Sequence, residues 1–268
     1  MIREKLIESG VGASSKFRWR SREVSRLEGL ADAVFGFAIT LLVVSLEVPR
    51  TFDDLLAMMA TFPAFAISFA LLLLVWYQHY VYFRRYDIED GLTMVLNSAL
   101  LFVVLFYVYP LKFVWTFLAN LIITGDPRVR LPGGEMIHPV TRDQTGAMMI
   151  VYSLGFVAVF AIFALLYWHA YRRRGEMGLN ELEVYDTKVE AYSSLLYVAV
   201  GLASVGIAAF RIGGGASPAI SGFVYALLGP VHYLHGRRAG KHRGRLEKSV
   251  AGELPQVTGE DGRVVDGE

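Results

Sequence analysis

Long apolar segments separated by charged connections dominate this sequence. Six of them are long enough to cross a bilayer, whose hydrocarbon core of about 30 Å requires about 20 apolar residues in a helix. Because lipid offers no partners to backbone polar groups, segments of this length cross it as helices that satisfy their own hydrogen bonds. The sequence therefore predicts an all-α integral membrane protein with no soluble domain and six transmembrane helices, over 29–48, 62–83, 92–111, 147–170, 191–210 and 217–235.

The remaining residues form two tails and several connections. Residues 1–28 are a polar N-terminal tail, and residues 236–268 are basic, then Gly-rich and acidic, a composition that predicts disorder. The 120–146 segment contains three prolines and a Gly-Gly pair. We interpret it as a long, variable external loop rather than as a cap over an entrance.

The distribution of Lys and Arg predicts the orientation in the membrane. Basic residues gather in the N-terminal tail, in the 84–91 and 171–190 connections and in the C-terminal tail, whereas the alternate connections carry few. By the positive-inside rule, a multi-pass protein of the cell membrane with both termini in the cytoplasm is expected. Topology accounts for these basic clusters, so no nucleic-acid partner is expected.

A carboxylate at the head of the first span requires an explanation, because a charge at bilayer depth costs about 2.5–3.5 kcal/mol on insertion scales. Asp32 and Arg26 lie on different faces of the helix, so each needs partners elsewhere. Trp76 and His79 share roughly one side of the second span, and His79 lies at the same cytoplasmic depth as Asp32. We predict a hydrogen-bonded network of these four residues that holds the first helix to the second or to a neighbouring subunit. The alternative is that Arg26 binds lipid phosphate and His79 lies among the head groups.

The first span also has a regular pattern of larger side chains. Phe37, Thr40 and Val44 share one stripe at helical spacing, and small residues, Gly29 and Gly36, follow a neighbouring stripe. Small residues let another helix approach closely. Taken alone, this pattern is compatible with simple packing against other helices.

The first three spans resemble the TMEM175-like (DUF1211) family of potassium channels. The signature of that family is Arg-x-x-x-Phe-Ser-Asp at the start of the first transmembrane helix. Arg26 and Asp32 stand at this spacing, but Leu30 and Ala31 replace the Phe and the Ser. Further matching positions are Trp76 and His79 in the second span, and Asn97 and Tyr109-Pro-Leu-Lys112 at the two ends of the third.

The resemblance implies a potassium-preferring, leak-like cation channel whose pore is lined by the first helix of each subunit. The positions that match the pore are Phe37 for a hydrophobic constriction, Thr40 for a hydroxyl ring and Val44 for a further apolar ring. A ring of apolar side chains gates by dewetting. One copy of the motif per chain implies a homotetramer, with K⁺ as the permeant ion and no cofactor.

Two other functions are weighed against a channel. A secondary transporter or proton-coupled carrier is expected to have charges near the bilayer midplane, whereas the ionisable residues here gather at helix ends. An enzyme would require convergent catalytic or metal-binding groups. The pair His232 and His235 has helical spacing but no accompanying carboxylates, so neither an enzyme nor a metal site is expected.

Overall fold

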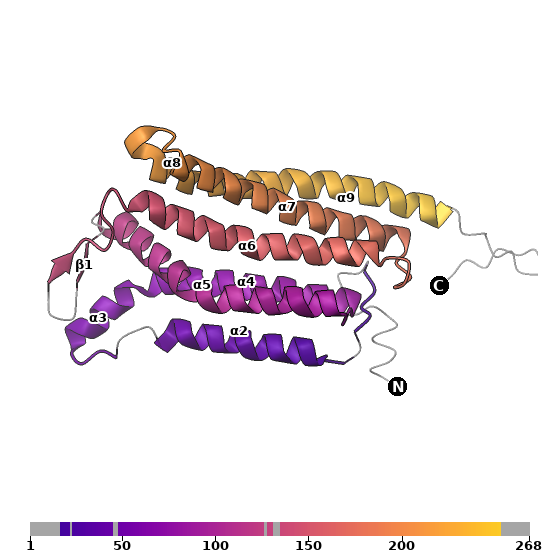
Figure 1. The fold of residues 1–268 in the computed structure, drawn as a ribbon, viewed down its shortest axis with the longest axis horizontal. Helices are drawn as coiled ribbons and strands as arrows, with labels where there is room; N and C mark the ends of the chain where they lie inside the picture. Colours follow the sequence, from indigo (N-terminus) through magenta and orange to yellow (C-terminus); the bar gives the residue numbers. More distant parts are fainter. Residues whose placement is uncertain (1–16, 22, 45–47, 126–127, 131–134, 253–268) are drawn as a thin grey trace, which may run out of the picture.

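The computed structural model describes residues 17–21, 23–44, 48–125, 128–130 and 135–252, in which the long helices lie side by side (Figure 1). The α-helices are α2 (Arg26–Val44), α3 (Phe52–Ala60), α4 (Phe62–Tyr86), α5 (Gly91–Thr124), α6 (Thr145–Arg172), α7 (Glu181–Ala209), α8 (Ser217–Phe223) and α9 (Leu228–Gly252). Two 3₁₀ turns, η1 (Gly214–Ala216) and η2 (Val224–Leu227), flank α8. A small antiparallel hairpin of β1 (Val129–Arg130) and β2 (Met136–Ile137) connects α5 to α6.

Within the described residues, five helices are long and apolar enough to cross a membrane, namely α2, α4, α5, α6 and α7. The expected sixth span over 217–235 is helical, but it is not one regular α-helix. The turn η2 divides it into α8 and the beginning of α9, so neither apolar piece alone reaches the length of a span. Before it, Gly213 and Gly214 take positive φ angles of 89° and 60°, which only glycine adopts without strain.

The third span is longer than the sequence predicts. It was expected to end at residue 111, but α5 continues through Pro110 to Thr124 and ends at Gly125, whose φ is 69°. Proline inside a helix removes one backbone hydrogen bond, here the one to the carbonyl of Phe106, and the helix continues beyond it. The connection between the third and fourth spans is correspondingly shorter than the expected 120–146 loop.

The fifth helix begins earlier than predicted, at Glu181 rather than residue 191. Asn180 and Glu183 form a capping box, in which each side chain accepts a hydrogen bond from the other residue's backbone N–H, at 2.8 and 3.1 Å. Such a box satisfies two of the free donors at a helix start. The helix therefore starts on polar residues and enters its apolar part about three turns later.

The C-terminal tail was predicted to be disordered, and this is wrong for residues 236–252, which belong to α9. Contacts with α7 hold this part of α9, among them an ion pair and a hydrogen bond. Arg243 Nε lies 2.8 Å from Asp186 Oδ1, and the Tyr185 hydroxyl donates to the Ala239 carbonyl at 3.2 Å. Residues 253–268, and residues 1–16 of the N-terminal tail, lie outside the described part of the chain.

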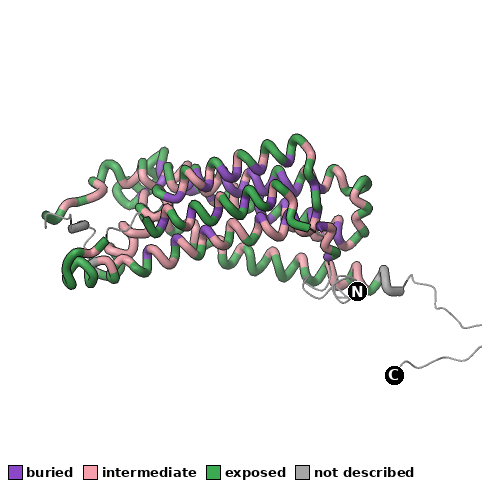
Figure 2. Tube along the Cα trace, turned by 90° about the horizontal axis from the view of Figure 1, so that it is seen from below, coloured by how far each residue is buried: buried purple, intermediate pink, exposed green. Residues whose placement is uncertain are grey.

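The core follows the middle of the bundle, and exposed residues dominate its outer helices (Figure 2). The order of packing places α2 at one edge, against α4 and α5; α5 also packs on α6, α6 on α7, and α7 on α9 (Figure 1). Tyr82, Tyr86 and Tyr167 are completely or nearly buried where α4 meets α6, with ring centroids 5.1–6.0 Å apart. Because α2 lies at the edge, one side of it remains uncovered.

Candidate pore face and the hydrogen bonds behind it

A capping box starts α2. The Glu28 N–H donates to Ser25 Oγ at 3.1 Å, and the Ser25 N–H donates to Glu28 Oε2 at 2.9 Å. Glu28 is buried, and its other carboxylate oxygen lies 3.7 Å from Arg84 Nε at the end of α4. The start of α2 is thus tied to the end of α4.

One face of α2 is buried in the protomer. Ala31, Phe35, Ala38 and Leu42 are at most 1% exposed and belong to the core formed with α4 and α5. Two of the four are alanines, which permit a close approach of the helices. Ala31 occupies the position of the family's serine, so a small buried residue is retained while the hydroxyl is lost.

The opposite face of α2 is uncovered. The predicted pore residues Phe37 and Val44 are 55% and 71% exposed, and Thr40 between them is also exposed. The same stripe continues toward the start of the helix through Leu30 and Arg26, both exposed. The three predicted pore residues therefore lie together on a face that no other described part of the same protomer covers.

The neighbouring stripe of α2 is open as well. A Cβ atom built on Gly29 or Gly36 would meet no other atom within 4 Å. The Thr40 hydroxyl donates to the Gly36 carbonyl at 2.9 Å. Because its hydrogen is used inside the helix, the lone pairs of the Thr40 oxygen remain available to a ligand on the exposed side.

Asp32 has a partner on α4. The indole Nε1 of Trp76 donates a hydrogen bond of 2.8 Å to Asp32 Oδ1 at the exposed edge between the two helices. This contact is one part of the predicted network of four residues. A hydrogen bond to a carboxylate is among the stronger ones, and it accounts for a charge at this position.

The other two members of the predicted network lie elsewhere, which corrects that prediction. His79 is 1% exposed, lies against Phe35 and Phe83, and forms a hydrogen bond of 2.8 Å between its Nε2 and Asn97 Oδ1 on α5. Arg26 is exposed at the first residue of α2 and makes no hydrogen bond or ion pair with the described residues. The expected network of four is therefore two separate pairs, Trp76–Asp32 and His79–Asn97.

Asn97, which the sequence indicates as a motif position, is completely buried. Its amide nitrogen has no partner among the described residues, so all of its polar contact is with His79. The pair joins α4 to α5 directly behind α2, since Phe35 of α2 packs on the imidazole.

A cluster of charges where the start of α5 meets the end of α6 is not indicated by the family motif. Asp90 Oδ2 lies 2.6 Å from His169 Nε2 and 2.7 Å from Arg173 Nη1, and Asp90 Oδ1 accepts from the Thr93 N–H at 2.8 Å as the N-cap of α5. Although partial burial opposes ionisation, the hydrogen bonds from Thr93 and His169 hold the pKa of Asp90 well below its usual range. The Asp–x–x–Thr spacing at the start of a helix is the sequence signal for this cap.

A second ion pair at this end of the bundle was also missed. Arg20 Nη2 lies 2.6 Å from Glu183 Oε2, and both side chains are nearly buried. It fixes the segment before α2 to the start of α7. Nothing in the local sequence pairs two residues that are 163 positions apart.

The described residues contain no group of three or more His, Asp or Glu side chains placed to hold a metal ion. His232, one of the two histidines considered for such a site, forms a hydrogen bond of 2.6 Å with the Tyr197 hydroxyl.

Comparisons with known proteins agree with the motif and the fold. Residues 26–107 match the model of the family described as endosomal/lysosomal potassium channel TMEM175. A potassium channel of Marivirga tractuosa is 40% identical over 246 residues, which cover 90% of this chain and 98% of that protein. A potassium channel of Chamaesiphon minutus is 29% identical over 156 residues, which cover 55% of this chain and 66% of that protein.

A solved structure shows the same fold. It is the crystal structure of a variant of the potassium channel MtTMEM175 in complex with a nanobody–MBP fusion protein, with a TM-score of 0.74 and 38% identity over 86% of this chain and all of that one. These relatives confirm the prediction of an all-α integral membrane protein, and they are channels rather than enzymes. The chain therefore belongs to the TMEM175 family of potassium channels.

Proposed function

We propose that this chain is one subunit of a homotetrameric channel that conducts K⁺ in preference to Na⁺ and whose pore is lined by α2. The observation that carries the proposal is the uncovered face of α2 with Phe37, Thr40 and Val44 on one stripe. The relatives described above are potassium channels, which supports the choice of ion.

Phe37 is the proposed constriction. Its ring is the largest side chain on the uncovered stripe, and one such ring from each subunit forms a narrow apolar ring around a central axis. A constriction of this kind excludes water until the pore widens, so gating by dewetting follows. Val44, about two turns further along, adds a second apolar ring.

Thr40 is the proposed ligand for the permeant ion. Its hydroxyl hydrogen is donated to the Gly36 carbonyl, so its oxygen points lone pairs toward the axis. A ring of neutral oxygens replaces only part of the hydration shell, which favours the cation that gives up water more easily. We propose that this ring provides the preference for K⁺ over Na⁺.

One α2 per chain cannot enclose a pore, so several subunits must assemble around it. We propose four, arranged with cyclic symmetry, in the cell membrane and with both termini in the cytoplasm. The clusters of Lys and Arg in the 84–91 and 171–190 connections support this orientation. Described spans carry no Arg at every third position, which supports a leak-like rather than voltage-driven conductance.

The test is reconstitution of the full chain into potassium-loaded liposomes. Phe37→Ala opens the constriction, so we expect a K⁺ flux about tenfold above that of the wild type, with lower selectivity. Phe106→Ala is the matched control, because Phe106 is 71% exposed on α5 and lies off the pore face, and it should leave the flux unchanged. Equal flux through all three proteins would exclude Phe37 as the constriction.

A further inference from the structure

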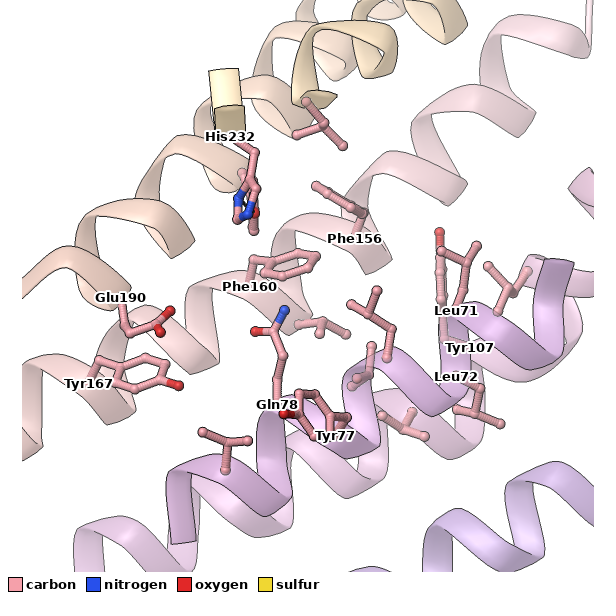
Figure 3. A pocket seen from close by; sticks show the side chains of 18 of the residues that line it. Leu71, Leu72, Tyr77, Gln78, Tyr107, Phe156, Phe160, Tyr167, Glu190 and His232 are labelled. Carbon is pink, nitrogen blue, oxygen red and sulfur yellow. Dashed lines mark hydrogen bonds between the residues drawn. The ribbon is translucent and has the colours of Figure 1, made fainter. Parts of the chain in front are cut away.

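A groove separates α4 from the second half of the protomer (Figure 3). It has a volume of about 680 Å³. Helix α5 packs on both α4 and α6 and closes the back of the groove, while α4 faces α6, α7 and α9 across it. The groove lies on the α6–α9 side of α4, away from α2, so it is separate from the proposed pore face.

The lining of the groove is apolar along most of its length. Along α4 it extends from Leu71 to Arg85, which corresponds to about 21 Å of helix, and aliphatic and aromatic side chains such as Val104, Val108 and Phe160 line its interior. One leaflet of the hydrocarbon core is about 15 Å thick. A hydrocarbon chain that enters from the bilayer can therefore run along the groove.

One end of the groove is charged. Arg85 Nη1 lies 3.2 Å from Glu190 Oε1, and the two side chains bridge α4 and α7 across the end of the cavity. The Glu190 side chain is 40% exposed and that of Arg85 is 15% exposed. The neighbouring Arg84 lies over the Tyr80 ring, a basic and aromatic combination typical of the level of the lipid head groups.

This end presents a positive and a negative group side by side. A zwitterionic head group carries a phosphate and an ammonium at a similar separation, so its charges complement those of Arg85 and Glu190. The guanidinium has five N–H donors, and its bond to Glu190 uses only one of them. The remaining donors can bind a phosphate.

Gln78 provides a polar group deeper in the groove. Its amide points into the cavity below Phe160 (Figure 3) and forms no hydrogen bond with the described residues. Gln78 lies about two turns of α4 from Arg85, or about 10 Å. An unpaired amide among apolar side chains costs free energy unless the occupant of the groove offers it a partner.

We propose that the groove binds a zwitterionic phospholipid with an amine head group. One acyl chain lies along α5, the Gln78 amide donates to an ester carbonyl, the phosphate contacts Arg85 and the ammonium contacts Glu190. The lipid fills the space between the two halves of each subunit and holds α4 against α7. It is a structural ligand of the fold, and its binding does not depend on which helix lines the pore.

The test is native mass spectrometry of the full chain after reconstitution in equal amounts of phosphatidylethanolamine and phosphatidylglycerol and extraction in detergent. The wild type should retain phosphatidylethanolamine. Gly229 belongs to the lining of the groove, and a Cβ atom built on it meets no other atom within 4 Å, so Gly229→Phe is expected to fill part of the groove. Retention by this variant should fall about tenfold.

Two further variants make the experiment specific. Gly236→Phe lies on the same helix, also in open space but off the groove, and should retain as much lipid as the wild type. Glu190→Gln removes the partner of the ammonium and leaves the charge of Arg85, so the retained lipid should shift to phosphatidylglycerol.

Three outcomes would overturn the proposal. They are equal lipid retention by Gly229→Phe and the wild type, no preference for the amine head group in the wild type, and loss of subunit association in Gly229→Phe without any lipid bound to the wild type. The last outcome would instead assign the groove to contact with a second copy of the chain.

Discussion

The indole Nε1 of Trp76 donates a hydrogen bond of 2.8 Å to Oδ1 of Asp32, and this contact fixes α2 against α4 at the edge of the uncovered face. The buried pair His79–Asn97 lies behind it and joins α4 to α5. Helix α2 therefore has one face held by the protomer and another free to meet other subunits. The predictions below separate the roles of the two faces.

The first prediction concerns the Trp76–Asp32 contact. Asp32→Ala and Trp76→Phe each remove the hydrogen bond, and each should lower the stability of the protein in detergent by about 1.5–3 kcal/mol, the range for a bond to a charged group. The double variant should be no less stable than the worse single variant, because both changes remove the same interaction. Thermal unfolding of the four proteins measures this coupling, and fully additive effects would show that the two residues act independently.

The second prediction concerns His79 and Asn97. Asn97→Leu leaves the imidazole of His79 buried without a partner, which should cost about 1–3 kcal/mol. Replacement of both residues by Leu removes the unsatisfied group and should recover part of the loss. Midpoints of thermal unfolding test this order. A double variant less stable than Asn97→Leu would mean that His79 contributes through packing against Phe35 and Phe83 instead.

How much of this arrangement the sequence predicts differs between residues. The sequence places Asp32 and Trp76 in one predicted network, and a hydrogen bond between these two residues is found. The predicted partner of His79 was wrong, because the depth of a residue in the membrane does not tell which side of its helix the side chain is on. The rotation of α4 turns His79 into the core, where Asn97 is within reach, while Arg26 remains at the surface.

The ends of the helices were predicted less well than their apolar parts. Hydropathy locates the segment that lipid surrounds, but tertiary contacts decide where a helix stops. The helix α9 continues beyond Gly236, where Arg243 forms an ion pair with Asp186 of α7. The helix α7 starts early because Asn180 and Glu183 cap its first turn. Such contacts join residues that are far apart in sequence, and local composition does not reveal them.

The third prediction tests the proposed selectivity ring. Thr40→Val keeps the shape of the side chain and removes its oxygen, so the preference for K⁺ over Na⁺ should fall about tenfold while conductance is retained. Thr61→Val, between α3 and α4 and off the pore face, is the control and should behave as the wild type. Reversal potentials in asymmetric K⁺ and Na⁺ solutions measure the ratio. An unchanged ratio in Thr40→Val would place selectivity elsewhere.

The last prediction concerns the charge cluster around Asp90. Asp90→Asn keeps an oxygen for the N-cap of α5 but removes the charge that pairs with His169 and Arg173. The pKa of Asp90 is lowered in the folded protein, so the stability that its ionised form provides is complete above its ordinary pKa of 3.8 and is lost as the pH falls through the lower folded value. Near pH 6–7 the free energy of unfolding of the wild type should therefore exceed that of Asp90→Asn by on the order of 1–2 kcal/mol, so the wild type should unfold at a higher temperature, and the difference should shrink below about pH 4. A difference between the two proteins that stays constant across this range would show that the charge of Asp90 does not stabilise the fold.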